Sequence, residues 1–460
     1  MPHQSFFFQT ISNLEHELQE NGCLDFPSGE CTCTLKCPIH PLLELNRWAR
    51  GYDQYTEKCW PRMRPALQLA SLFLTEDCML PWFEHVASGR LKTRDSKQYP
   101  KVYIDPVPST LTKERIQRVK QQLRDMAEVT TFMFTPRKYK NTGDGQAWGA
   151  TSRFKNEFDW CREFRREDMP YIDNRYRIDP KFAHRGRPCI SLSYRFQDYF
   201  CKGQERANSR AQDFRISLLF AVTIVHEIAH AYWMYLGRSH SRLTGHGEPY
   251  WNLDDKEAEL GFSWEAMTIG RILSPAQSEL NLCTILYSML FRNYRERGQR
   301  RITVSQLVDR AGVTFRDVPL PPPHKFDMVA QGMRSNTWFC RDGGRAEAYY
   351  LVIIHAIPIK WVADWFLEEE WERKRRVWRQ TGKFSPPPLG PTFMLVYARN
   401  PDGWARLRYS IRDDADPYLE DVRNQAESMG CTESIDRSGI PLLREYDHNN
   451  GMVISSSVEA

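Results

Sequence analysis

Residues 214–237, FRISLLFAVTIVHEIAHAYWMYLG, decide how the rest of this chain can fold. They read as one helix that is apolar on nearly every face, and a helix of that kind is buried. Gly237 stands at the position where helices commonly end in a left-handed residue, so it marks the C-terminal end. We therefore expect this helix to form the centre of the fold, with other elements packed around it.

Within this helix, His226 and His230 stand four residues apart and Glu227 lies between them. Residues four apart share one helix face, with Cβ atoms roughly 5–6 Å apart, so both imidazoles can point at one ion. Glu227 lies about 100° round the axis, where it can reach a water on that ion rather than the ion itself. This HExxH pattern predicts a zinc site with two histidine ligands and a glutamate base. The alternative is a buried histidine pair without metal.

Length, net charge and cysteine content limit the classes of protein to which this chain can belong. The 460 residues suffice for two or three domains, and a net charge of +5 is too small to predict a general surface for nucleic acid. Residues 1–20 lack the pattern of a signal peptide, and no apolar run approaches the roughly 18 residues of a membrane span. Twelve cysteines without such a signal favour a reducing compartment, the cytoplasm or the nucleus, with free or metal-bound thiols.

The mixture of helical and extended patterns predicts an α+β protein. We expect a helical and irregular region at 1–95, a domain at 96–292 in which the central helix packs on a small mixed sheet, and an α+β region at 293–460 with proline-rich connectors. Both terminal regions are expected to be mainly helical. Helices are predicted at 42–55, 64–86, 112–129, 254–273 and 277–298, strands at 101–106, 130–136 and 187–196, and a strand followed by a helix at 348–366.

Two of the predicted elements carry a further expectation. The strand at 187–196 lies shortly before the central helix, so an open outer edge could pair with an extended peptide beside the metal; an ordinary sheet strand is the alternative. Residues 367–380 place three glutamates four residues before three basic residues, which is typical of a solvated helix face. These pairs are Glu369 with Arg373, Glu370 with Lys374, and Glu372 with Arg376.

A second group of possible metal ligands stands near the N-terminus. Cys31, Cys33, Cys37 and His40 lie within ten residues, and Zn²⁺ takes four sulfur or nitrogen ligands tetrahedrally. Their spacing matches no common zinc module, so reduced thiols in a loop are the expected arrangement and a second zinc is the alternative.

Catalytic zinc sites use three protein ligands and leave the fourth position to water, so a third ligand is expected after His230. Three candidates follow it in the sequence: His246 in a Gly-His-Gly loop, Glu257 and Glu259. Glu257 follows Asp254 with capping-box spacing, which gives it a structural role at the start of a helix.

Glu259 has no such capping role. It continues an apolar stripe of Phe262, Ala266, Ile269 and Leu273 at helical spacing, so it is expected to point inward, although Leu260, Trp264 and Met267 make a second stripe. Glu259 is therefore the leading candidate for the third ligand, ahead of His246 and then Glu257.

These motifs resemble those of the gluzincin branch of the zincin metallopeptidases, in which a helix carrying HExxH is followed by a glutamate on the next helix. A closer resemblance is to zincin-like proteins of filamentous fungi, and it covers about the middle third of the chain. It rests on HEIAHA at 226–231, EPYW at 248–251, AELGFSWE at 258–265 and AIP at 356–358. HEIAHAY followed by GHGEPY is also similar to SprT-like proteases, and that resemblance implies His246 as the third ligand.

The zincin resemblance implies a zinc metallopeptidase that acts on a peptide or protein substrate. Glu227 would be the general base, His226, His230 and Glu259 would be the metal ligands, and Tyr250, His240 or His246 would stabilise the oxyanion. A zinc-binding protein of the same fold without turnover, and a SprT-like protease of DNA-bound proteins, are the alternatives. The sequence leaves the substrate and the oligomeric state open.

Overall fold

The structure is a computed structural model of the whole chain. It describes residues 15–26, 31–50, 55–94, 101–106, 111–139, 147–152, 186–202, 209–238, 240, 243, 247–253, 258–275, 280, 285–296, 316–317, 350–384, 386–399, 405–413, 431–433, 446–447 and 452–453. The described residues belong to two compact units. The site unit comprises Cys31–Arg271 and Val362–Pro387, and the sheet unit comprises Met1–Glu30, Ile272–Trp361 and Pro388–Ala460.

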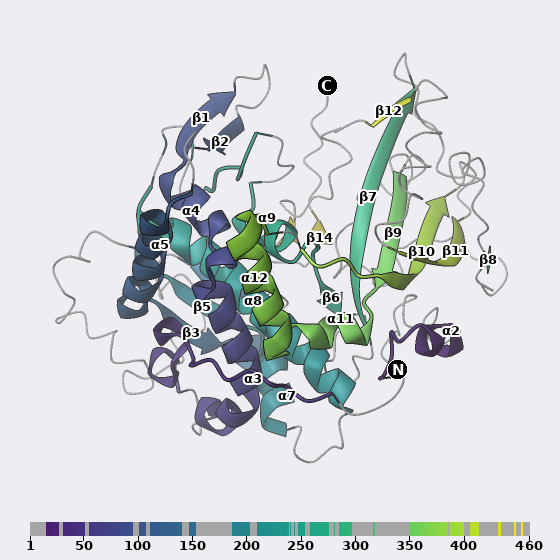
Figure 1. Cartoon of the computed structure of the whole chain (residues 1–460), viewed down its shortest axis with the longest axis horizontal. Helices are drawn as coiled ribbons and strands as arrows, with labels where there is room; N and C mark the ends of the chain where they lie inside the picture. Colours follow the sequence, from purple (N-terminus) through teal and green to yellow (C-terminus); the bar gives the residue numbers. More distant parts are fainter. Residues whose placement is uncertain are drawn as a thin grey trace. The chain divides into compact units, whose positions relative to one another are not determined.

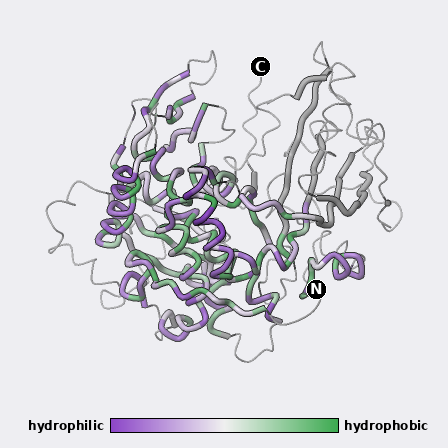
Figure 2. The backbone as a smooth tube through the Cα atoms, viewed as in Figure 1, coloured by the Kyte–Doolittle hydropathy of each residue, from purple (hydrophilic) through white to green (hydrophobic). Residues whose placement is uncertain are grey.

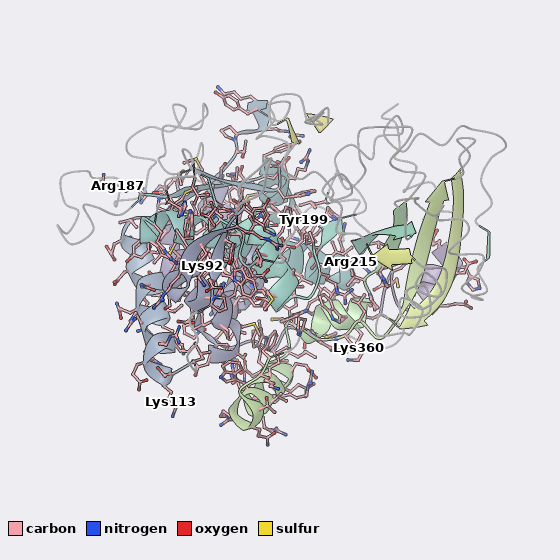
Figure 3. The ribbon with its side chains drawn as sticks, turned by 90° about the horizontal axis from the view of Figure 1, so that it is seen from above. Lys92, Lys113, Arg187, Tyr199, Arg215 and Lys360 are labelled. Carbon is pink, nitrogen blue, oxygen red and sulfur yellow. A yellow bond between two sulfur atoms is a disulfide. The ribbon has the colours of Figure 1, made fainter. Side chains whose placement is uncertain are left out.

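The site unit mixes helices with small sheets (Figure 1). Its helices are α3 (Tyr55–Thr75), α4 (Pro81–Ser88), α5 (Lys113–Asp125), α7 (Tyr194–Lys202), α8 (Arg210–Leu236), α9 (Leu260–Thr268) and α12 (Glu368–Thr381). Its strands are β1 (Arg90–Arg94), β2 (Lys101–Asp105), β3 (Thr131–Phe134), β4 (Gly149–Ser152) and β5 (Cys189–Leu192). Figure 2 shows α5 and α12 as largely hydrophilic helices, and Lys113 at the start of α5 is exposed (Figure 3). This composition confirms the predicted α+β class.

Helix α8 contains residues 214–236 of the apolar stretch, and nearly all of its side chains are buried. The Ser209 side chain accepts a hydrogen bond from the Gln212 amide at its N-terminus, and Gly237 ends it with a left-handed φ of 63°. Among the described residues, α8 is the one helix long and apolar enough to span a membrane, but 89% of its most apolar window is buried inside the fold. A buried core helix meets the same criterion, and the burial is what the sequence predicts.

The small sheet beside α8 has the strand order β3-β5-β4. Strand β5 pairs in parallel with β3 and antiparallel with β4, with Gly149 opposite Leu192 and Ser152 opposite Cys189. Aromatic side chains fill the space between this sheet and α8: Trp48 stacks on Phe132 at 5.0 Å and lies 6.4 Å from Phe220 of α8, measured between ring centroids. The sheet therefore holds one side of the central helix.

The expectation of an open edge on the strand at 187–196 is wrong. Strand β5 covers only Cys189–Leu192, both of its edges are paired, and the chain turns into helix α7 at Tyr194. Alternation within one strand reveals which face is buried but not which strands lie on either side, because neighbours come from distant sequence. The edge position next to β5 belongs to β4.

Helix α7 is tied to the rest of the site unit at its C-terminal end. The Tyr199 hydroxyl donates to Asp213 of α8 at 2.5 Å, and Arg62 of α3 donates to the Tyr199 carbonyl at 2.9 Å. Tyr199 and Arg215 are each 1% exposed and lie inside the unit (Figure 3). A disulfide joins Cys59 of α3 to Cys201 of α7.

That disulfide corrects the prediction that the thiols are free or metal-bound. The Cα atoms of Cys59 and Cys201 lie 4.7 Å apart, within the range that a disulfide bridges, although 142 residues separate them in sequence. Packing of α7 on α3 brings them together, and spacing along the chain gives no sign of it. The predicted location in the cytoplasm or nucleus stays a prediction.

The sheet unit corrects the expectation of a mainly helical C-terminal region. Its largest sheet has the order β12-β7-β9-β10-β11-β8, with β6 beside β7. The strands are β6 (Ser274–Pro275), β7 (Leu286–Glu296), β8 (Arg316–Asp317), β9 (Tyr350–Ala356), β10 (Pro391–Arg399), β11 (Ala405–Asp413) and β12 (Cys431–Glu433). Strand β9 and helix α11 (Ile359–Asp364) confirm the strand and helix predicted at 348–366.

Strand β7 replaces the helix predicted at 277–298. Residues 286–296 are rich in apolar and aromatic side chains, so helical spacing and alternation both fit the pattern, and pairing with β9 decides for the strand. The helix predicted at 42–55 is also wrong for its described part, where two 3₁₀ turns, η1 (Pro41–Leu43) and η2 (Leu45–Arg47), take its place. The predicted boundaries at 95 and 292 stay predictions, because compactness does not show which segments fold alone.

Helix α12 forms where it is predicted, but Lys374 does not lie on a solvated face. Its side chain is 7% exposed, and its Nζ lies 4.7 Å from the ring centroid of Trp365 and 5.1 Å from that of Trp371. Burial lowers the pKa of Lys374 to about 8. The i,i+3 pair between Glu370 and Arg373 at 2.7 Å does face solvent. At Lys374, the packing of α12 on Trp365 buries a side chain that the charge pattern predicts to be exposed.

Candidate metal centre

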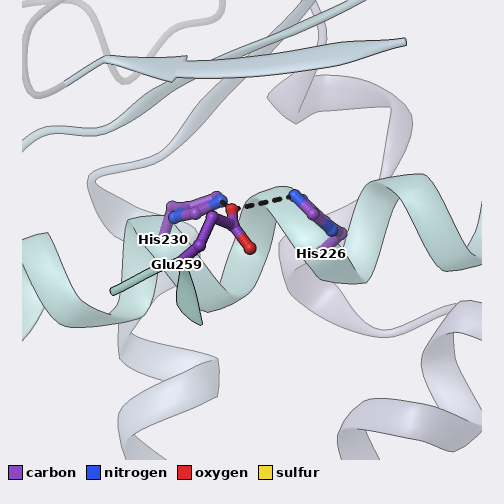
Figure 4. Close-up of side chains that lie close together, drawn as sticks. All are labelled: His226, His230 and Glu259. Carbon is purple, nitrogen blue, oxygen red and sulfur yellow. Dashed lines mark ion pairs between the residues drawn. The ribbon is translucent and has the colours of Figure 1, made fainter. Parts of the chain in front are cut away.

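Two histidines of α8 and one carboxylate from the start of α9 meet at one point (Figure 4). The Nε2 atom of His230 lies 2.6 Å from Oε1 of Glu259, and that of His226 lies 3.3 Å from the same oxygen. One ligand atom from each of the three residues lies within 4.8 Å of the other two. This His226–His230–Glu259 cluster could hold a metal ion, and the side chains are only 13%, 17% and 20% exposed, respectively.

Glu259 reaches the histidines from the N-cap of α9 rather than from inside a helix. Its backbone is extended, and its side chain accepts a hydrogen bond from the Phe262 amide. The stripe that predicts an inward Glu259 is only partly buried, because Ile269 and Leu273 are buried but Ala266 is exposed. The structure therefore brings the leading candidate to the histidines for a different reason from the predicted one.

Two further carboxylates hold the other ring nitrogen of each histidine. Nδ1 of His226 donates to Oε1 of Glu265 at 2.7 Å, and Nδ1 of His230 donates to Oε1 of Glu248 at 2.7 Å. Glu248 also accepts a hydrogen bond from the Leu260 amide at 3.0 Å, which ties it to the start of α9. Such partners fix the ring orientation and leave Nε2 to face an ion.

Glu248 and Glu265 were not predicted to take part in the site. Both stand in the segments that carry the resemblance to zincin-like proteins, EPYW and AELGFSWE, which is the one signal that marks them. Glu265 is only 5% exposed, and a buried carboxylate needs a partner, but no spacing rule connects it to His226, 39 residues earlier.

Without a metal, these groups share protons. Burial lowers the pKa of His226, but Glu259 and Glu265 outweigh that effect and raise it to about 10. Burial likewise lowers the pKa of His230, while Glu248 and Glu259 raise it well above its usual value. Burial raises the pKa of Glu259, but the two histidines lower it overall. An imidazole must lose a proton to bind a metal, so metal and protons compete here.

Glu227 lies on a different side of α8 and is not one of the three clustered residues. It is 4% exposed, and its Oε2 accepts a hydrogen bond from the Thr151 hydroxyl of β4 at 2.6 Å. Burial raises the pKa of Glu227, against the opposing effect of His226 and His230. The three predicted ligands are therefore brought together, and the predicted base is kept apart from them.

The donor set suits a transition metal with one open position. Two imidazole nitrogens and one carboxylate oxygen are ligands that zinc takes in catalytic sites. The approach of α9 to the histidines depends on Gly261, because a Cβ added there would lie 2.4 Å from Nε2 of His226. The side chains fit an ion with these ligands, and its identity belongs to the proposal below.

The other predicted site residues fall in different places. His246 and Glu257, together with the predicted capping box at Asp254, lie outside the described residues. Tyr250 pairs with β2, since its carbonyl accepts from the Ile104 amide at 2.9 Å. His240 contacts Thr93 of β1, with 3.3 Å between Nε2 and Oγ1. The roles of Tyr250 and His240 at an oxyanion stay predictions.

Cys31, Cys33, Cys37 and His40 are described, and they do not assemble a ligand group. Within the described part of the chain, the His226–His230–Glu259 cluster is the one group of three or more such side chains close enough to hold an ion. Cys37 donates its Sγ hydrogen to the Gln68 carbonyl at 3.4 Å, and His40 Nδ1 accepts from the Leu42 amide at 3.2 Å. The three cysteines of this segment are reduced thiols, as expected.

Comparison of the chain with protein-family models, with curated proteins and with solved structures finds no match. The resemblance to zincin metallopeptidases therefore rests on the sequence motifs alone.

Proposed function

We propose that this protein is a zinc-dependent metallopeptidase with Glu227 as its general base. The observation that carries the proposal is the separation of roles in the site. His226, His230 and Glu259 converge on one point, while Glu227, the remaining buried carboxylate of α8 beside them, is held by Thr151 and left out of that group. Glu259, Glu265 and Glu248 already contact the histidines. A purely structural metal site would not require Glu227 as a fourth buried carboxylate outside the ligand group.

His226, His230 and Glu259 would hold the ion, with Glu265 and Glu248 orienting the two imidazoles. A zinc ion there supplies a Lewis acid that polarises a peptide carbonyl and makes a bound water more acidic. Three protein ligands leave room for that water, as catalytic zinc sites require.

Glu227 supplies the proton transfers. Burial raises the pKa of Glu227, which makes it a stronger base than an exposed glutamate. In peptide hydrolysis it takes the proton from the attacking water and delivers it to the amine that leaves. One carboxylate thus acts first as base and then as acid.

The test is Glu227→Gln, which keeps size and helix packing but cannot accept a proton. On a peptide that the parent cleaves, kcat should fall by about 10²–10⁴-fold, the usual contribution of a positioned general base. Zinc content and melting temperature should stay near those of the parent. Glu369→Gln, an exposed change on α12, serves as the control and should leave kcat unchanged.

Equal kcat in the parent and in Glu227→Gln would contradict the proposal. A parent that binds zinc but cleaves no member of broad peptide libraries would favour the alternative, a zinc-binding protein of this fold without turnover. Zinc that is retained without Glu259 but lost without His246 would favour the SprT-like alternative.

A further inference from the structure

Strand β4 touches Glu227 at two of its four residues. The Thr151 hydroxyl lies 2.6 Å from Oε2 of Glu227 and 3.1 Å from the Glu227 carbonyl oxygen. Gly149, two residues earlier and therefore on the same face of the strand, faces the other carboxylate oxygen. A Cβ added at Gly149 would lie 2.5 Å from Oε1 and 2.6 Å from Cγ of Glu227.

The hydroxyl of Thr151 carries one proton, so the two contacts are not equal. The shorter one, to the carboxylate, is charge-assisted when Glu227 is ionised and is the stronger of the two. It occupies Oε2. Threonine is also stiff at χ1, so a hydroxyl on a sheet strand holds its partner in a narrow range of positions.

Gly149 completes the arrangement by its lack of a side chain. Any Cβ at this position would overlap the carboxylate of Glu227, so the side chain would turn away from β4. Thr151 and Gly149 together therefore select one orientation of a carboxylate that has little freedom to be solvated, since Glu227 is 4% exposed.

We infer that Thr151 is a positioning residue for Glu227, and that Gly149 is required to be small so that this orientation is reached. The inference rests on the proposed function, and it assigns to strand β4 the contact that orients the base. Thr151 acts through Glu227 and need not touch the substrate.

The experiment compares Thr151→Val, which keeps the shape and removes the hydroxyl, with Thr151→Ser, which keeps the hydroxyl. Thr135→Val is the matched control, because Thr135 directly follows β3 of the same sheet and its hydroxyl contacts Ser191 of β5 at 2.9 Å. The probe is acetohydroxamic acid, which gives up a proton when its two oxygens bind zinc. Its affinity for the zinc-loaded protein, measured by calorimetry, therefore reports a correctly oriented base and needs no known substrate.

Thr151→Val should weaken acetohydroxamate binding by about tenfold or more, the effect of one hydrogen bond to a charged group. Thr151→Ser and Thr135→Val should stay within about threefold of the parent, since one keeps the bond and the other lies elsewhere. Gly149→Ala should weaken binding at least as much as Thr151→Val. Zinc content should be unchanged in all four variants. On a cleaved peptide, Thr151→Val should lower kcat and leave KM within about threefold.

Parent-like acetohydroxamate binding in Thr151→Val, with weakened binding in Glu227→Gln, would overturn the positioning role and leave the proposed function standing. Loss of zinc in parallel with the probe would also overturn it, because Thr151 would then be structural. If Glu227→Gln binds the probe as the parent does, or if the zinc-loaded parent binds none, Glu227 does not serve the metal and the proposed function fails with the inference.

Discussion

The site unit holds two groups of possible zinc ligands, and only one of them is assembled. His226, His230 and Glu259 meet within 4.8 Å, whereas Cys31, Cys33, Cys37 and His40, which are closer in sequence, do not. The histidines of the first group lie on one face of a helix, which sets their separation. The second group lies in a segment without regular structure before η1, where nothing repeats the direction of the side chains. In this protein, nearness in sequence alone does not assemble the second group.

The histidines of the two groups also differ in the charged groups that surround them. Glu259, Glu265 and Glu248 surround His226 and His230 with carboxylates, whereas Nδ1 of His40 is used by the Leu42 amide. Burial lowers the pKa of His40 to about 4, and Arg124 adds to that effect, while the carboxylates raise the pKa of His226 to about 10. A buried histidine with carboxylate partners attracts a cation, and one without them stays neutral.

Removal of ligands should give the largest difference between the two groups. The double variant His226→Ala/His230→Ala should purify without zinc, because two of three ligands are gone. The triple variant with Cys31, Cys33 and Cys37 changed to Ser should keep about one zinc per chain. Atomic absorption on the purified proteins measures both. Full zinc occupancy in the double variant would show that the first group does not hold the ion. A loss of zinc in the triple variant would show that the second group is a metal site.

The next largest effect is expected at Glu259. Glu259→Gln should weaken zinc binding by more than about 100-fold, because a neutral amide is a poor zinc ligand and ligand loss exceeds the 10–100-fold typical of residues behind the ligands. Glu257→Gln is the control and should retain zinc. Competition with a chelator gives both affinities. Zinc lost on His246→Ala and kept on Glu259→Gln would reassign the third ligand to His246.

The carboxylates behind the histidines should contribute less than a ligand. Glu265→Gln and Glu248→Gln should each weaken zinc binding by about 10–100-fold, since the imidazole loses the partner that fixes its orientation and raises its basicity. The same chelator competition applies. Gln68→Leu removes a polar side chain that donates to the Cys37 carbonyl at 2.9 Å, and it should not change zinc affinity. Unchanged affinity in both glutamate variants would mean that α8 and α9 alone orient the histidines.

The two groups should also respond to pH, with opposite sign. In the metal-free protein, His226 is protonated when folded up to a pKa of about 10, so its stabilising contribution is complete below about pH 6.5 and is lost as pH rises toward 10. His40 has a folded pKa of about 4, so the unfolded chain binds more protons between about pH 6.5 and 4, and stability falls as pH drops.

Chemical denaturation across pH tests both signs. His40→Asn keeps an N-cap acceptor and removes the titrating ring, so it should reduce the loss of stability between pH 6.5 and 4 by at most about 3 kcal/mol.

Calorimetry of zinc uptake near pH 7 in buffers of different ionisation enthalpy should show release of about two protons, from His226 and His230. Zinc uptake without proton release would mean that these histidines are neutral before the metal binds.

Features that depend on local periodicity can be predicted from the amino-acid sequence without the fold. The apolar composition of residues 214–237 determines a buried helix that ends at Gly237, and the four-residue spacing of His226 and His230 determines that they share a face. The same helical geometry sets Glu227 apart from them. These are properties of one continuous element, so no knowledge of the remaining fold is needed to predict them.

The side chains from other elements that contact this helix are set by the packing of distant segments. Glu259 arrives through the N-cap of α9, Glu265 and Glu248 arrive from positions that no spacing rule connects to the histidines, and Thr151 arrives from an edge strand. Strand order and disulfide pairing have the same character: β5 is central because β4 pairs beside it, and Cys59 meets Cys201 across 142 residues. Such contacts depend on how loops return the chain, and short-range patterns carry no information on that path.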